Sequence, residues 1–182
     1  MLTLTPPRLV LLLLLSLASV MPAHPAHAES LEGKVEKILV PYAKELAASA
    51  TVVQAVKAAN EKKKGKTISN AEWKRKAVTD PFVQSLLSNE AANELEKKRA
   101  LFVSEIFVSS ADGTKVAFLD KTSSWNHKGR PKHDLPMTGK VWIGKLELDE
   151  SSGVNQIQVS VPVLEGGRPI GTITVAAAAT KL

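Results

Sequence analysis

The apolar residues of the chain change their spacing near residue 100, from a helical period to an alternating one. Before residue 100 they recur every three or four positions, which is typical of helices with one buried face. A long helical stretch begins at Leu31 and continues towards Asn60. Pro41 lies inside it and predicts a kink or a break, because proline lacks the amide that a helix interior needs. The predicted buried face comprises Leu31, Val35, Ile38, Leu39, Tyr42, Leu46, Val52, Val53 and Val56.

Two further helices are predicted from their starting residues. Ser69 and Glu72 have the spacing of a capping box, in which each side chain bonds the backbone amide of the other, so a short helix begins there and includes Trp73. Asp80 precedes Pro81, and aspartate is a good cap while proline suits the first helical position. We expect this last helix to continue to about Lys98, with Phe82, Leu86 and Leu87 on its buried face.

After residue 100 the alternation of apolar and polar residues predicts strands joined by short turns. Turn signals stand at Asp112-Gly113, at Ser152-Gly153 and around Gly166-Gly167. Helices followed by hairpin-linked strands predict an α+β fold, an antiparallel sheet of about five strands with the N-terminal helices packed on one side. The predicted strands are 102–108, 115–119, 140–148, 156–161 and 170–177.

The polar segment 120–139 has no periodicity and is too long for a simple connection between strands. Loops of this length in compact domains are usually functional. We therefore expect the segment to lie over the sheet and to form part of a binding site.

The first residues have the order of a secretory signal peptide. Arg8 precedes the apolar run 9–20, and Ala26-His27-Ala28 fits a small-residue cleavage site. The run is shorter than the roughly 20 residues that span a bilayer, although an uncleaved anchor remains the alternative. We expect a signal peptide at 1–28 and a periplasmic domain at 29–182.

The composition excludes several kinds of chemistry. The chain has no cysteine, which rules out a thiol nucleophile, a cysteine-based zinc site and covalent haem attachment. It also lacks a nucleophile elbow and a glycine-rich phosphate loop. The net charge is +6 with four lysines at 62–66, but no aromatic residues are interleaved with them. This predicts a solvated turn rather than a nucleic-acid site, with attraction to an anionic membrane as an alternative. We expect neither an enzyme nor a bound cofactor.

Three stretches of the second half resemble the Cache (PDC) family of extracellular sensor domains. They are 104–117, similar to the family's opening hairpin, 156–163, similar to its "I-S-x-P-V" strand, and 167–175, similar to its closing "G-x-x-I-G-x-I-x-V" strand. The long N-terminal helix matches the family's lead-in, here 29–99, before a sheet at 100–178. The resemblance implies a PAS-like fold that recognises a small molecule outside the cytoplasm.

The resemblance also implies a pocket between the sheet and the loop 120–139. Amino-acid-binding members have an arginine followed by aromatic residues in this loop and a later aspartate. Pro131 follows the arginine here, so the pattern is not complete. We take an amino acid, an amine or an organic acid as the expected ligand. The candidate ligand-binding residues are Trp125, Arg130, Trp142, Asp149 and Asp120.

Each candidate also has a structural alternative. Trp125 either stacks on the ligand or pins the loop to the core. Arg130 either grips a carboxylate or forms a surface ion pair, and Asp120 either receives an amine or caps a turn. His127 and His133, with the adjacent Asp134, match no zinc motif, so we expect no metal.

The expected function is that of a stand-alone sensor or carrier. The chain ends at Leu182 directly after the last predicted strand, so signalling would need a membrane receptor or kinase as partner. The alternative is a periplasmic protein-interaction module that binds no small ligand.

Overall fold

A computed structural model describes residues 29–62, 68–149 and 153–182, with the side chain of Asp149 excluded. The predicted signal peptide, most of the lysine turn, and Ser152 of the second predicted turn lie outside the described residues. Within them, no helix is both long and apolar enough to cross a bilayer.

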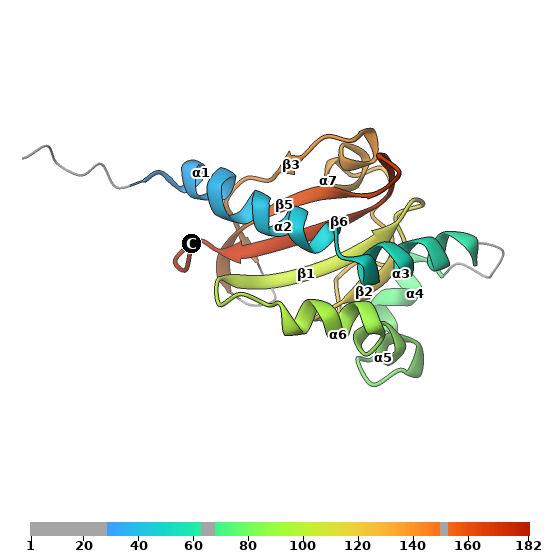
Figure 1. The fold of residues 1–182 in the computed structure, drawn as a ribbon. Helices are drawn as coiled ribbons and strands as arrows, with labels where there is room; N and C mark the ends of the chain where they lie inside the picture. Colours follow the sequence, from blue (N-terminus) through green and yellow to red (C-terminus); the bar gives the residue numbers. More distant parts are fainter. Residues whose placement is uncertain (1–28, 63–67, 150–152) are drawn as a thin grey trace, which may run out of the picture.

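The centre of the fold is an antiparallel sheet of six strands in the order β2-β1-β6-β5-β3, with β4 also paired to β5 (Figure 1). The predicted α+β class and the antiparallel arrangement are therefore confirmed. Gly113 has a φ of +84° in the β1–β2 hairpin, as the turn signal predicts. The strands are β1 Val103–Ser110, β2 Lys115–Phe118, β3 Trp142–Ile143, β4 Glu147–Asp149, β5 Val154–Glu165 and β6 Arg168–Ala178.

The single strand expected at 140–148 is wrong, because two short strands occupy that stretch. Ile143 pairs with Val159, whereas pairing resumes with Glu147 opposite Gln156. Three residues on one side thus face two on the other, and an unmatched residue interrupts a ladder in this way. The interruption separates β3 from β4 beside Gly144.

The first helical stretch passes Pro41 without a break. Helix α1 (Leu31–Lys34) is followed by a π-helix, η1 (Val35–Leu39), and by α2 (Val40–Ala47). Pro41 lies in the first turn of α2. Because a π-turn already replaces the regular hydrogen bonds there, the missing proline amide is accommodated. The break comes instead at Ser49, whose ψ of 129° is not helical, and α3 (Ala50–Glu61) follows.

The next helices begin where their caps predict. Ser69 and Glu72 form both halves of the capping box of α4 (Asn70–Arg75), and the Asp80 side chain accepts from the Phe82 amide at the start of α5 (Pro81–Leu87). The helix predicted to run on to Lys98 is interrupted, however. Asn89 caps α6 (Glu90–Lys97) and also donates to the carbonyl of Val116 in β2. This contact with the sheet accompanies the division of one helix into two.

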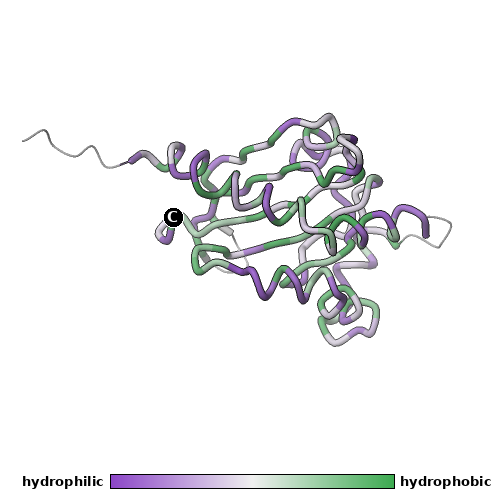
Figure 2. The backbone as a smooth tube through the Cα atoms, viewed as in Figure 1, coloured by the Kyte–Doolittle hydropathy of each residue, from purple (hydrophilic) through white to green (hydrophobic). Residues whose placement is uncertain are grey.

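One face of the sheet is covered by α2, α3 and α6, and Figure 1 shows α2 in front of the strands. Its core residues are the apolar half of each alternating strand, and Figure 2 shows these central strands as mostly hydrophobic. Strand residues in this core include Ile106, Val108, Val159, Val161, Ile173 and Val175.

The opposite face is partly aromatic and partly polar. Phe107 and Phe118 are register partners there and pack with Trp73 of α4, Val83 of α5 and Trp125. The polar part lies nearer β5, under the segment that contains α7 (Pro131–Asp134) and the 3₁₀ helix η2 (Pro136–Thr138). This side of the sheet is where segment 120–139 crosses, as the sequence predicts.

Candidate functional site

A cavity of about 590 Å³ lies on the polar face of the sheet, and we call it the polar cavity. Its floor includes Phe107 of β1 together with Gln156 and Gln158 of β5. Its walls come from segment 120–139 and from the β3–β4 region. The charged and hydrogen-bonding wall residues include Lys74, Lys121, Thr122, Ser123, His127, Lys132, Trp142, Lys145 and Glu147.

Lys132 joins the wall of the polar cavity to its floor. Its Nζ donates to Oε1 of Gln158 at 2.6 Å and lies about 6 Å from the ring centres of Phe107 and Trp142. Burial lowers the pKa of Lys132, while the nearby carboxylate of Glu105 opposes that shift. Lys132 is therefore a half-buried cation beside a flat aromatic wall, an arrangement that attracts anions with an apolar part.

His127 is fixed by backbone contacts with the β1–β2 turn. Its amide donates to the carbonyl of Gly113 at 3.0 Å. A Cβ on Gly113 would collide with the backbone nitrogen of Lys128, so only glycine allows this close approach. Gly113 thus serves two purposes. It forms the hairpin turn, and it allows the backbone around His127 to pack closely against that turn, which places His127 at the polar cavity.

The His127 ring contacts a lysine that is almost completely buried. Nζ of Lys115 lies 2.8 Å from Nδ1 of His127 and 3.5 Å from the ring centre of Phe107, and Lys115 is 3% exposed. Burial, followed by the charge of Lys115, lowers the pKa of His127 to about 2. The imidazole is therefore neutral at physiological pH.

The neutral His127 ring carries its proton on one of its two nitrogens. Its Nε2 makes no hydrogen bond with any described residue, and the residue lines the polar cavity. When Lys115 donates to Nδ1, the ring proton must reside on Nε2. His127 then offers a hydrogen-bond donor to a ligand.

The glutamines of the floor are held by their neighbours. Ser104 donates to Oε1 of Gln156 at 2.7 Å, and Nε2 of Gln158 donates to Glu105 at 3.3 Å. Since Gln158 also accepts from Lys132, both ends of its amide are used. The floor is therefore preorganised, and the wall above it has more basic than acidic residues.

Helix α4 supports the loop that closes the polar cavity. Nε1 of Trp73 donates to the carbonyl of Thr122 at 2.6 Å. Asn70 bonds the backbone of Asn126 in both directions, at 2.9 and 3.3 Å. These bonds attach the loop to a helix far away in sequence and hold the wall of the cavity in place.

Two of the predicted ligand residues lie in different environments. Trp142 lines the polar cavity, as expected for a ligand contact. Trp125 is 7% exposed and packs with Trp73 and Phe82, each at 5.3 Å between ring centres. This position matches the alternative in which Trp125 pins the loop to the core, and it separates Trp125 from the polar cavity.

The other predicted residues do not join Trp142 either. Arg130 is exposed at the start of α7, and Asp120 is exposed with its carboxylate 3.9 Å from Arg99. Neither lines the polar cavity, and the side chain of Asp149 lies outside the described residues. The predicted grouping of Trp125, Arg130 and Trp142 around one cavity is thus not what the structure shows, and any role of these residues in binding remains a prediction.

The two histidines weighed as metal ligands have other partners. His133 lies 3.1 Å from the carboxylate of Asp134 and 3.2 Å from the carbonyl of Ser110, and it is buried. Within the described ranges, no three His, Cys, Asp or Glu side chains come together as a metal site would require.

Sequence reasoning missed Lys115 and Lys132 as parts of the site. Lys115 stands in a short hairpin strand and Lys132 in a polar loop, positions where lysine is usually solvated. Phe107, opposite Phe118 on the face away from α2, α3 and α6, was the available signal that this side also contains a core.

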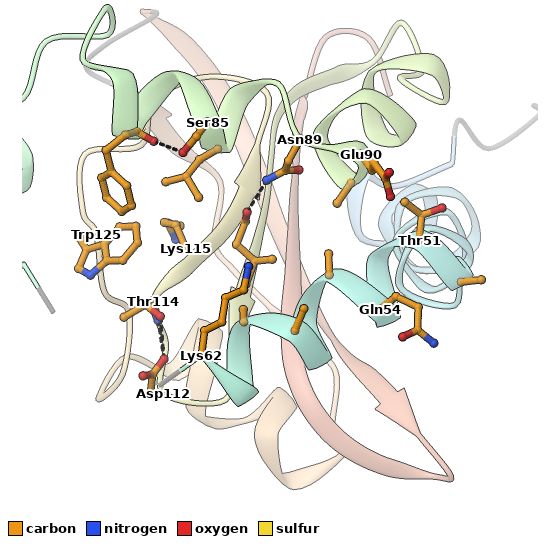
Figure 3. Close-up of a pocket in the computed structure, with 18 residues that line it drawn as sticks. Thr51, Gln54, Lys62, Ser85, Asn89, Glu90, Asp112, Thr114, Lys115 and Trp125 are labelled. Carbon is orange, nitrogen blue, oxygen red and sulfur yellow. Dashed lines mark hydrogen bonds between the residues drawn. The ribbon is translucent and has the colours of Figure 1, made fainter. Parts of the chain in front are cut away.

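A second and larger depression, which we call the helix groove, has a volume of about 1040 Å³. It lies between α3 and the α5–α6 pair, and Figure 3 shows Thr51 and Gln54 towards one end and Trp125 and Asp112 towards the other. Alanines of α3 line much of it. Lys115 is seen beside Trp125 at its wall, so this lysine lies between the helix groove and the polar cavity.

No protein family and no curated protein matches the chain in sequence. Among solved structures, it is similar to the sensor domain of the Vibrio cholerae histidine kinase DctB, with a TM-score of 0.49 and 17% identity over 83% of this chain and 54% of that one. It is also similar to the sensory domain of the Campylobacter jejuni chemoreceptor Tlp3 with isoleucine bound, with a TM-score of 0.42 and 12% identity over 81% and 62%.

A third similar structure is the ligand-binding domain of the Pseudomonas aeruginosa chemoreceptor PctC in complex with GABA, with a TM-score of 0.38 and 12% identity over 81% and 62%. The chain spans between half and two thirds of these three domains. One of the three is a sensor domain of a histidine kinase, and the other two are the sensory or ligand-binding domains of chemoreceptors.

Proposed function

We propose that the polar cavity binds a small organic anion and that the chain acts as a sensor or carrier for it. The observation behind this proposal is the charge of the wall, where Lys74, Lys121, Lys132 and Lys145 outnumber the two acidic residues of the cavity, Glu105 and Glu147. A carboxylate leaving water needs a paired cation, because an unpaired buried charge is costly. Lys132 is the best placed of these lysines, since it reaches the floor.

The remaining surfaces suit the rest of such a ligand. Trp142 offers an aromatic face for an apolar or flat portion. The amide of Gln156 and the donor nitrogen of His127 suit polar substituents. Among the ligand classes expected from the sequence, an organic acid fits this wall best and a simple amine fits it least.

The cellular setting is part of the same proposal. The apolar run 9–20 and the small residues at 26–28 support export of a domain that starts at Glu29. Mass spectrometry of the protein from its native cell tests this, and an intact Met1 terminus in the membrane fraction would contradict it. In the exported setting, a membrane receptor or kinase would transmit the binding event.

A ligand screen tests the binding proposal directly. The 29–182 protein is heated with carboxylic acids, amino acids and amines in separate wells, and unfolding is followed by fluorescence. A ligand at 100 times its Kd stabilises the fold by about 2.7 kcal/mol, which raises Tm by several degrees. Stabilisation by carboxylates and not by amines supports the proposal, whereas stabilisation by amines alone would refute it.

The helix groove favours a second candidate, the protein-interaction module. Ala55, Ala58 and Ala59 of α3 leave space beside the apolar Phe82 and Leu86, and a groove of this kind suits an apolar helix of a partner. If no small anion binds and substitutions in the helix groove abolish association with a membrane partner, this candidate replaces the sensor.

A further inference from the structure

We propose that an anion entering the polar cavity is bound together with one proton, which Lys115 takes up. The inference rests on the proposed anion-binding function and adds a regulation to it. The reaction has a simple balance, in which the anion and one proton from solvent are bound and Nζ of Lys115 changes from amine to ammonium. Nothing is released, and no covalent bond to the ligand forms.

Three neighbours surround Nζ of Lys115, and each can accept one hydrogen of an ammonium group. Its polar hydrogen-bond neighbours in the described part of the chain are Nδ1 of His127 at 2.8 Å and Oγ of Ser109 at 3.4 Å. Its third contact is the face of Phe107 at 3.5 Å. An ammonium group can direct one hydrogen at each of these. The ammonium form is therefore well shaped for this site, although these three neighbours are uncharged.

Charged and titratable groups face Lys115 from several segments. Glu105 of β1 favours its charged form, whereas Arg130 and Lys132 oppose it. Burial is the largest influence, and together these effects place the pKa of Lys115 well below its ordinary value of 10.5. On the side of the helix groove, Lys62, Glu90 and Asp112 are the charged lining residues, and His127 and His133 complete the set towards α7.

An anion favours the ammonium form for two reasons. Its charge attracts the proton on Lys115 past His127 and Phe107, which contact Lys115 and line the polar cavity, and electrostatic interactions are strong in such poorly solvated surroundings. In addition, an ammonium must donate to Nδ1 of His127, which places the imidazole proton on Nε2. The ammonium form thus gives the anion a positively charged neighbour and a hydrogen-bond donor on Nε2 of His127. The uncharged amine provides no positive charge and does not determine which nitrogen of His127 carries the proton.

The coupling predicts a definite pH dependence. Over the range between the pKa of Lys115 in the unliganded protein and its raised pKa in the complex, each bound anion takes up close to one proton. By linkage, affinity falls as pH rises through this range, by up to about tenfold per pH unit. Below the range Lys115 is already charged, so affinity is highest there and does not change with pH.

Acetate is the probe, because it stays ionised above about pH 6 and cannot itself supply the pH dependence. Its binding to the 29–182 protein is titrated by NMR from pH 6 to 10, with ¹⁵N-labelled lysine reporting the charge of the Lys115 Nζ in the same samples. The expected result is a falling affinity together with a Lys115 signal that changes from amine to ammonium when acetate is added at constant pH.

The variant Lys115→Met keeps the length of the side chain and removes its charge. It is expected to bind acetate with an affinity that no longer depends on pH, while the control Lys97→Met, at an exposed position of α6, behaves as the wild type. If Lys115→Met does not fold, the wild-type Lys115 signal still decides the question.

Two outcomes separate this inference from the proposed function. Acetate binding that is independent of pH in the wild type, with no change in the charge of Lys115, would overturn the proton uptake and leave the anion site standing. Absence of binding by acetate and by every other carboxylate of the screen at any pH would overturn both.

Discussion

The Nζ of Lys132 lies 2.6 Å from Oε1 of Gln158, and this hydrogen bond connects the short helix α7 to the middle of strand β5. It is a charge-assisted bond inside the polar cavity, and such bonds are stronger than neutral ones. The contact orients the Lys132 side chain beside the ligand space without neutralising it, because the glutamine amide has no net charge.

Replacing this lysine is expected to remove most anion binding. A hydrogen bond to a charged group contributes about 1.5–3 kcal/mol, so Lys132→Met should weaken acetate affinity by at least tenfold at pH 7. Lys97→Met removes the same charge from an exposed site and is expected to leave affinity unchanged. NMR titration measures both. Equal affinities in the two variants would exclude Lys132 from the site.

His127 is expected to make the protein sensitive to acid. Burial lowers its pKa in the folded state to about 2, from the 6.5 of an unperturbed imidazole, so the unfolded chain binds the extra proton. This difference leaves the free energy of unfolding unchanged above pH 6.5. Below that value it lowers the free energy of unfolding by about 1.4 kcal/mol per pH unit, down to the folded pKa.

The variant His127→Gln isolates this contribution, because glutamine does not titrate and still offers an acceptor to Lys115. Urea unfolding at pH 7 and pH 4.5 should show a loss of stability about 2.5 kcal/mol larger in the wild type than in the variant. Contributions of the carboxylates are common to both proteins. An equal loss in both would mean that the imidazole is not held neutral by its burial.

The alternation of apolar residues in β5, where Ile157, Val159 and Val161 belong to the helix-covered core, was sufficient with the turn signals to predict the antiparallel sheet. The divided helix at Asn89 was missed: Asn89 is a good N-cap whose side chain accepts from the Ala92 amide, but its bond to Val116, 27 positions further along the chain, leaves no local trace. Local spacing is informative where one element determines its own structure, and it fails where a distant partner does so.

The same distinction explains the site. Trp142 was predicted because a tryptophan outside the core pattern is conspicuous. Lys115 was not, because its burial depends on the segment around His127 being folded over β2, with Gly113 allowing the close approach. A sequence pattern contains the residue types of a cavity but not the tertiary contact that removes a lysine from water.

Gly144 is expected to control the shape of the cavity wall. A Cβ there would lie 2.8 Å from Cη2 of Trp142 and 3.3 Å from the carbonyl oxygen of Gln158. Gly144→Ala must therefore displace the indole, which should weaken ligand binding and alter tryptophan fluorescence. The backbone at Gly144 does not have a positive φ, so unfolding free energy should change by no more than about 1 kcal/mol.

The matched control is Gly33→Ala in α1, where the nearest neighbours of the new Cβ are the flexible side chains of Glu29 and Ser30. Its fluorescence and acetate affinity should equal those of the wild type. If Gly144→Ala also leaves both unchanged, Trp142 has room to move and does not form a rigid wall.

Two neighbouring tryptophans allow the support of the loop to be measured. Nε1 of Trp73 donates to the carbonyl of Thr122 at 2.6 Å, whereas the buried Nε1 of Trp125 has no partner in the described part of the chain. Their rings are 5.3 Å apart in one cluster, so replacing either by phenylalanine removes similar apolar contact. Only Trp73→Phe also leaves a buried carbonyl without its hydrogen bond, which costs about 1–3 kcal/mol. In urea unfolding, Trp73→Phe should therefore be less stable than Trp125→Phe by about that amount. The reverse order would show that packing, rather than this hydrogen bond, holds the loop on α4.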